Sequence, residues 1–230
     1  MSEHLSKQFD VELENIRSRI LQMGSLVERQ VLAAIEALNT GVLAEMQQVI
    51  DRDEQVDADE VAIDEECMLL IARRQPTAGD LRLILAILRI VTDLERIGDK
   101  AAKIAGMAQA LHLAGDQRLP RLSDLHHCAR LATAMLRDAL DALARGDVDA
   151  ARRVIGADQA VDTAFNAILR QLVTYMMEDP RTITEALEII WIAKAIERVG
   201  DHATNIAEDV VFIVNGIDIR HTSAQQADEA

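Results

Sequence analysis

Hydrophobic residues recur at helical spacing along nearly the whole chain, and the pattern is interrupted at only a few points. The interruptions are Asn39-Thr40-Gly41, Gln75-Pro76, residues 114–120, Gly146-Asp147, Asp179-Pro180 and Gly216. They predict six helices, over about residues 4–38, 42–74, 77–111, 121–145, 148–178 and 182–216. Thr77 with Asp80, and Thr182 with Glu185, have the spacing of capping boxes and would begin the third and sixth helices.

The last three predicted helices repeat the first three. At an offset of 105 residues, apolar, glycine and aspartate positions coincide, from Val31 and Leu136 to Asp57 and Asp162. At the end of each half the offset falls to 102, which indicates that the third helix of each half starts differently. We therefore predict an all-α fold of two tandem, internally repeated three-helix bundles, residues 1–113 and 121–216, followed by a disordered tail at residues 217–230.

Each half also carries two pairs of acidic residues spaced four apart, so that both carboxylates of a pair project from one helix face. The chain has 39 acidic residues, and several such pairs arise by chance. Only the pairs present in both halves therefore carry weight. They are Asp53 with Asp57 and Glu95 with Asp99 in the first half, and Asp158 with Asp162 and Glu197 with Asp201 in the second.

The two pairs of one half are expected to meet across a helical hairpin. Asp57 lies 19 residues before Pro76 and Glu95 lies 19 after it, while Asp53 and Asp99 are each 23 residues away. In antiparallel helices all four carboxylates then stand roughly 28 to 35 Å from the turn. The same coincidence recurs in the second half to within one residue.

These carboxylates also project from apolar helix faces, where clustered charges lose solvation and repel one another. Either a cation or protonation must compensate them. Gly98 and Gly200 stand inside the two Glu-Arg-x-Gly-Asp segments, which suggests that something approaches the helix closely there. Oxygen ligands favour magnesium, manganese or iron ions, with zinc possible. The alternative is an acidic patch that is protonated or paired with Arg96 and Arg198.

Composition narrows the class of protein. Half of the residues are hydrophobic but only 2% are aromatic, which favours aliphatic helix packing. The net charge of −15 argues against direct binding to nucleic acid or to anionic membranes. No apolar run is long enough for a membrane-spanning helix, and the chain begins with polar residues, so we expect a soluble cytoplasmic protein.

A few other residue types attract attention but are expected to be structural. Cys67 and Cys128 lack the spacing of a metal site, and His126-His127 has no counterpart in the other half. We expect reduced core thiols at both cysteines. Trp191 and Tyr175 are expected to be core or interface anchors rather than ligand contacts.

Several segments together resemble the PhoU family of phosphate-transport regulatory proteins. They are the two Glu-Arg-x-Gly-Asp segments, the continuation His202-Ala203-Thr204-Asn205-Ile206-Ala207-Glu208, and the turn Gln75-Pro76 followed by Asp80-Leu81-Arg82. The resemblance covers nearly the whole chain. It implies two three-helix bundles, a homodimer or higher homo-oligomer, and acidic E(D)xxxD motifs that bind metal clusters in some members. Carried over to this chain, the implied metal ligands are Asp53, Asp57, Glu95, Asp99, Asp158, Asp162, Glu197 and Asp201.

The resemblance further implies negative regulation of the phosphate regulon and of high-affinity phosphate uptake. The protein would act as a noncatalytic adaptor between the ATPase subunit of the phosphate ABC transporter and the sensor histidine kinase. A metal-dependent phosphohydrolase and a metal-binding or storage protein are the alternatives. No activated serine or cysteine, nucleotide-binding loop or shared histidine is visible in the sequence, so we expect no enzymatic activity.

Overall fold

The computed structural model describes residues 2–115 and 123–220. Within these residues every long regular element is an α-helix and no strand occurs, which confirms the predicted all-α fold. None of the described helices combines the length and apolarity that a bilayer crossing requires. The helices are α1 (Ser2–Thr40), α2 (Leu43–Asp51), α3 (Asp53–Arg74), α4 (Ala78–Ala114), α5 (Ser123–Arg145), α6 (Val148–Glu178) and α7 (Ile183–Asn215), with a 3-10 turn at Pro180–Thr182.

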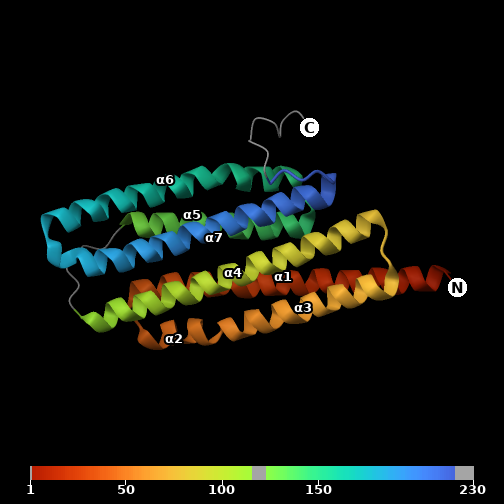
Figure 1. The fold of residues 1–230 in the computed structure, drawn as a ribbon, viewed down its shortest axis with the longest axis horizontal. Coiled ribbons are helices and arrows are strands. Elements are labelled where there is room, and N and C mark those ends of the chain that lie inside the picture. Colours follow the sequence, from red (N-terminus) through yellow and green to blue (C-terminus); the bar gives the residue numbers. More distant parts are fainter. Residues whose placement is uncertain (1, 116–122, 221–230) are drawn as a thin grey trace.

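The helices run roughly parallel to the long axis of the molecule in two groups (Figure 1). α1 to α4 form one group and α5 to α7 the other, and α4 and α7 pack side by side where the groups meet. One continuous cluster of buried aliphatic residues runs through both halves, including Ile87 and Leu94 of α4 and Ile192 and Ile206 of α7. The two repeats therefore bury their hydrophobic faces together, on each other as well as internally.

The second predicted helix is wrong in one respect, because the structure divides it into α2 and α3 at Arg52. The corresponding position of the second half, Ala157, lies inside the continuous helix α6. Starting a new helix at Asp53 places Asp53 and Glu54 in its first turn. Free backbone N–H groups and the helix dipole stabilise carboxylates there, which gives a physical reason for the break.

The predicted capping boxes are also wrong in their bonding, although both threonines stand at helix starts. The Thr77 hydroxyl donates to the Asp80 carboxylate over 2.8 Å and caps no backbone N–H group. Thr182 donates to the backbone oxygen of Asp179 over 2.7 Å. The Asp179 side chain instead accepts from the backbone N–H of Arg181, because a 3-10 turn precedes α7. Among the described residues no such turn precedes α4, so the two helices begin differently.

Polar contacts join the two halves along the meeting line of α4 and α7. Asp93 of α4 accepts from Asn205 over 3.0 Å and lies 2.8 Å from Nδ1 of His202. Arg89 of α4 lies 3.3 Å from the buried carboxylate of Asp209, whose pKa burial raises to about 7. These contacts fix the register of α4 against α7, and with it the relative height of the acidic segments on the two helices.

Two predicted regions fall largely outside the described residues. The expected linker at residues 114–120 lies mostly in the undescribed residues 116–122, and most of the expected disordered tail lies in residues 221–230. The described start of that tail contacts the fold. Asp218 pairs with Arg220 and lies 4.0 Å from Arg89 of α4.

Candidate functional site

The four predicted acidic residues of the first half come from two contacting helices, α3 and α4. Burial raises the pKa of Asp53 to about 6, and the nearby charges of Asp99 and Asp57 raise it further. Burial and the charge of Asp99 likewise raise the pKa of Glu95, while Arg96 opposes the shift. Asp57 is exposed and the other three are partly buried. The structure therefore brings these residues close enough to repel one another, and we call Asp53, Asp57, Glu95 and Asp99 the first cluster.

The second half repeats this arrangement between α6 and α7, with Asp158, Asp162, Glu197 and Asp201 as the second cluster. Burial raises the pKa of Asp158, followed by the charges of Asp201 and Asp162. Glu197 is the most deeply buried member, at 7% exposure. The predicted repetition of the acidic site thus extends from sequence to position in the fold.

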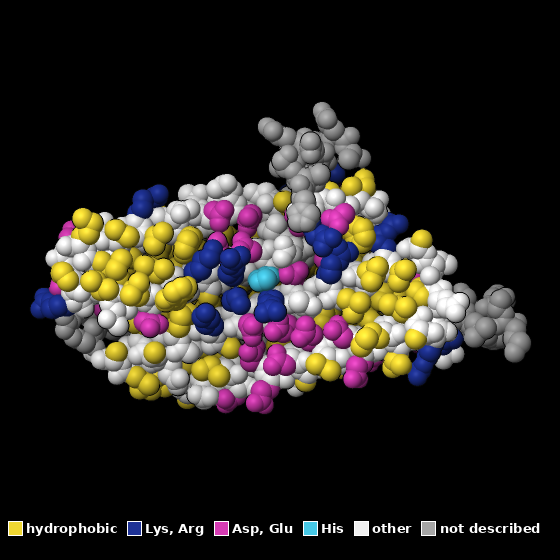
Figure 2. Space-filling view, in the orientation of Figure 1, with side chains coloured by type: hydrophobic (Ala, Val, Ile, Leu, Met, Phe, Trp, Pro, Cys, Tyr) yellow, Lys and Arg dark blue, Asp and Glu magenta, His cyan; other side chains and the backbone are white. Residues whose placement is uncertain are grey.

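Basic side chains lie between the two clusters on one face of the molecule (Figure 2). Arg96 is 3.4 Å from Glu95, and Arg198 is 2.9 Å from Asp201. Both arginines are more than half exposed, so solvent screens these contacts and each contributes little to stability. The arginine pairing expected as an alternative does occur, but it leaves much of the acidic charge uncompensated.

The donor atoms fit a hard cation. No described group of three or more His, Cys, Asp or Glu side chains already has the closed geometry of a metal site. However, Asp53 Oδ1 and Glu197 Oε2 are buried without any hydrogen-bond partner among the described residues. Buried anionic oxygens in that state carry a desolvation cost that an oxygen-binding cation would remove. Asp53 and Glu197 are therefore the cluster residues with buried oxygens available to an added ligand.

The two glycines differ in how closely they are approached. A methyl group on Gly98 would lie 3.1 Å from Asp53 Oδ1 and 3.2 Å from Val56 Cγ1, tighter than ordinary contact. A methyl group on Gly200 would meet Val161 at 3.4 Å, an ordinary van der Waals distance. The predicted close approach is confirmed at Gly98, whereas at Gly200 the neighbour is a valine rather than a carboxylate.

Sequence reasoning missed Gln30 of α1. Its side chain is 1% exposed, and neither its Oε1 nor its Nε2 has a hydrogen-bond partner within the described residues. Oε1 lies 3.5 Å from the position that a methyl group on Gly98 would occupy, so it faces the first cluster. At the repeat offset of 105 residues, Gln30 corresponds to Met135. An amide at a position that is apolar in the other half was the feature of the sequence that could have identified Gln30 as a site residue.

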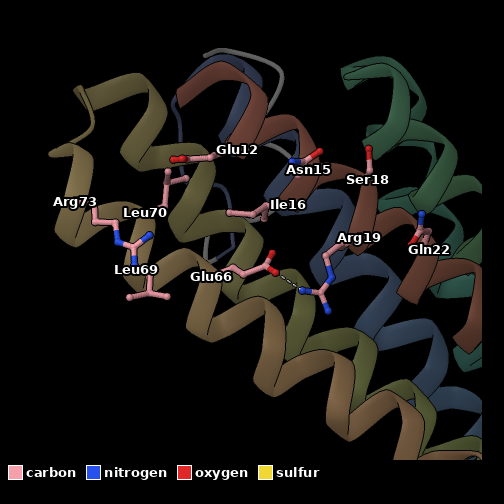
Figure 3. A pocket seen from close by; sticks show the side chains of 10 residues that line it. All are labelled: Glu12, Asn15, Ile16, Ser18, Arg19, Gln22, Glu66, Leu69, Leu70 and Arg73. Carbon is pink, nitrogen blue, oxygen red and sulfur yellow. Dashed lines mark hydrogen bonds and ion pairs between the residues drawn. The ribbon is translucent and has the colours of Figure 1, made fainter. Parts of the chain in front are cut away.

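A groove of about 560 Å³ between α1 and α3 is a separate feature (Figure 3). Its α3 residues begin at Glu66, nine positions beyond Asp57, or about 14 Å along the helix. Two of its lining residues, Arg19 of α1 and Glu66 of α3, form an ion pair at 2.5 Å. The groove gathers no acidic pair and is not part of the carboxylate site.

The cysteines are buried free thiols, as expected, and burial raises the pKa of each to about 12, which makes them poor nucleophiles and ligands. His126 bonds to Asn39 of α1 and thereby ties α5 to the first half. Trp191 is 55% exposed, which favours the interface alternative over the core one, and its role at an interface stays a prediction.

Comparison with known proteins relates both halves of the chain to a single protein family. Residues 20–108 and 125–210 each match the PhoU domain. The phosphate-specific transport system accessory protein PhoU of Escherichia coli is 44% identical over 229 residues, covering 100% of this chain and 94% of the relative. Its homolog in Pseudomonas aeruginosa is 48% identical over 222 residues, covering 96% and 91%.

Two solved structures share the fold over 91% of this chain. The crystal structure of PhoU from Pseudomonas aeruginosa has a TM-score of 0.87 at 48% identity and is covered over its full length. The phosphate transport system regulatory protein PhoU from Streptococcus pneumoniae has a TM-score of 0.84 at 27% identity, with 98% of that chain covered. The agreement at 27% identity indicates that the two-repeat architecture tolerates extensive sequence change.

Alanine substitution separates the two glycines. Gly200→Ala is expected to raise the free energy of unfolding by up to about 1 kcal/mol, because alanine is favoured in helix interiors and its methyl fits against Val161. Gly98→Ala is expected to give a free energy of unfolding lower than that of Gly200→Ala by about 1 kcal/mol or more. Its methyl group would lie closer to Asp53 and Val56 than ordinary van der Waals contact allows. Urea unfolding with chelator present measures both, and equal gains would contradict the close approach at Gly98.

Asp53→Asn tests the electrostatic cost of the first cluster. Since the folded-state pKa is raised from 3.8 to about 6, the neutral side chain favours folding at low pH, and this contribution is lost as pH rises through 6. In chelator, the variant is therefore expected to match the wild type near pH 4 and to exceed its stability near pH 7.5, by about 1 kcal/mol after allowance for solvent screening. A difference independent of pH would show that Asp53 is not destabilised by ionisation.

Proposed function

The chain belongs to the PhoU family, and from this membership we propose that it restrains high-affinity phosphate uptake and the phosphate regulon as a noncatalytic adaptor. The support is that relatives matching nearly all of the chain are named as accessory proteins of the phosphate-specific transport system. In this role the protein contacts the ATPase subunit of the phosphate transporter and the sensor histidine kinase of the regulon from the cytoplasmic side.

One observation carries the proposal from the family to this molecule: the same four-carboxylate cluster is built twice, at equivalent places of the repeat, against the electrostatic cost of doing so. A stability cost maintained at both sites indicates a function for the charge. We propose that magnesium, manganese, iron or zinc ions bind there. The ions would supply positive charge, and the cluster residues would hold α3 against α4, and α6 against α7, around them.

The side chains around the clusters favour binding over catalysis. No described serine or cysteine stands beside a base that would activate it, and both thiols have strongly raised pKa values. The nearest histidine, His202, is held by Asp93 at 2.8 Å. A phosphohydrolase would need a positioned base or an activated nucleophile, so the adaptor is the better-supported function.

An exposed apolar stripe on α7 offers a docking surface next to the second cluster. Ile183, Leu187 and Trp191 follow one another at single helical turns and are 42%, 46% and 55% exposed. Figure 2 shows that hydrophobic side chains gather toward that end of the molecule. Lys103 of α4 lies 5.9 Å above the Trp191 ring. Large aromatic residues with adjacent charge are typical of binding hot spots.

Capture of the two partners tests the adaptor role. Immobilised wild-type protein is expected to retain both the transporter ATPase subunit and the cytoplasmic part of the kinase. Trp191→Ala is expected to weaken at least one of these interactions by about tenfold or more, since truncating a hot-spot residue costs on the order of 2 kcal/mol.

Val61→Ala serves as the matched control, because Val61 is 58% exposed but lies on α3, away from the stripe. It is expected to bind like the wild type. If the wild-type protein retains neither partner, the adaptor proposal is wrong.

A further inference from the structure

The two acidic clusters are repeated, but the side chains beside them are not. At the repeat offsets, Gln30 of the first half corresponds to Met135 of the second, and Thr92 corresponds to Lys194. Two further acids of α3, Glu60 and Asp64, correspond to Phe165 and Leu169 of α6. Each replacement changes how charge or oxygen atoms are presented to the cluster, so the two halves need not bind the same thing.

In the first half, the buried amide of Gln30 lies next to the first cluster and has no hydrogen-bond partner among the residues that the structure describes. Gln30 Oε1 and Asp53 Oδ1 lie 3.5 and 3.1 Å from the point that a methyl group on Gly98 would occupy, and Val56 Cγ1 lies 3.2 Å from it, so both oxygens approach the bare helix backbone at Gly98. Neither oxygen, nor Gln30 Nε2, has a hydrogen-bond partner within the described part of the chain. An unpaired buried amide and an unpaired carboxylate oxygen at the same glycine point to a bound group that both oxygens contact.

The charge of the first half narrows the chemistry of that group. Burial raises the pKa of Glu60, and the charges of Asp64 and Asp57 add to the effect. Burial also raises the pKa of Asp64, whose Oδ1 has no partner among the described residues. A group that contacts the Gln30 amide oxygen and the Asp53 carboxylate together, in a half with two additional acids, fits a cation. Hard divalent cations such as Mg²⁺ and Mn²⁺ are bound in this way.

The second half contains a positive charge of its own. Lys194 Nζ lies 2.5 Å from Glu197 Oε1 and 5.3 Å from the centre of the Phe165 ring, a position that combines an ion pair with a cation–π contact. Met135, in place of Gln30, is 4% exposed and offers only a thioether, which is a poor ligand for hard cations. The ammonium group thus pairs with one oxygen of the most deeply buried carboxylate of the second cluster, while the other oxygen, Oε2, lies 3.9 Å from Arg198.

We propose that the two clusters are specialised. The first binds a hard divalent cation through Gln30 Oε1 together with Asp53, whereas in the second the ammonium group of Lys194 supplies part of the positive charge and weakens cation binding. This inference rests on the proposed cation-binding role of the clusters and adds Gln30 as a ligand that only one half possesses. The affinity for a hard cation is consequently much higher in the first half.

Exchanging the distinguishing residues between the halves tests the proposal. The full-length protein is stripped with chelator, and Mn²⁺ binding is counted from the loss of the free-ion electron paramagnetic resonance signal. The wild type is expected to show tight binding at one cluster only. Gln30→Met is expected to weaken that binding by about tenfold or more, which corresponds to the loss of one good ligand contact. Lys194→Thr is expected to strengthen Mn²⁺ binding at the second cluster, but to less than the affinity of the first, because Met135 supplies no oxygen ligand there.

The folding of each variant is checked by circular dichroism and by thermal unfolding in the absence of metal. Gln30→Met should fold at least as stably as the wild type, because Met135 shows that methionine fits the equivalent buried position. Gln30→Leu provides a second apolar replacement. The same titration on Glu95→Ala removes a first-cluster carboxylate and should abolish the tight site.

The outcomes separate the inference from the proposed function. If the wild type binds Mn²⁺ tightly at both clusters, and neither Gln30→Met nor Lys194→Thr changes this, the specialisation is wrong while cation binding stands. If the wild type binds no Mn²⁺, Mg²⁺ or Zn²⁺ up to millimolar concentration, the cation-binding role itself is wrong and the inference falls with it.

Discussion

Aliphatic helix packing holds like-charged carboxylates together, and the rest of the site depends on this constraint. Residues such as Leu94 and Ile97 on α4 and Ile196 and Val199 on α7 are fully or almost fully buried, and they immediately flank Glu95 and Glu197 in sequence. Once these residues pack, the acidic side chains cannot turn to solvent without breaking the core. The hydrophobic effect therefore maintains an arrangement that electrostatics alone opposes.

The duplication turns this constraint into two sites with a common register. Asp93 of α4 contacts His202 and Asn205 of α7, so the two halves are locked to each other close to both acidic segments. A change in charge at either cluster therefore acts on helices that meet at the centre of the molecule (Figure 1). This geometry suits a protein whose proposed task is to alter contacts with partners rather than to transform a substrate.

The repeat itself made much of this predictable. Comparing the halves identified the helical hairpins and the paired acidic segments, because helical periodicity and rise per residue fix height and facing. The break at Arg52 and the cap at Asp179 were missed, since both depend on local competition for backbone hydrogen bonds. Gln30 was missed because it looks like an ordinary polar helix residue, and only tertiary packing shows that it is buried against Gly98. The sequence left Trp191 open between core and interface, because only tertiary packing shows that this side chain is exposed.

We propose that bound cations compensate the buried negative charge of the two acidic clusters. The most direct measurement is elemental analysis of protein purified without chelator, comparing the wild type with the double variant Glu95→Ala, Glu197→Ala. We expect a stoichiometric amount of a divalent or trivalent metal in the wild type, about one ion or more per chain, and its loss in the folded double variant. Equal, near-zero metal content in both proteins would contradict it.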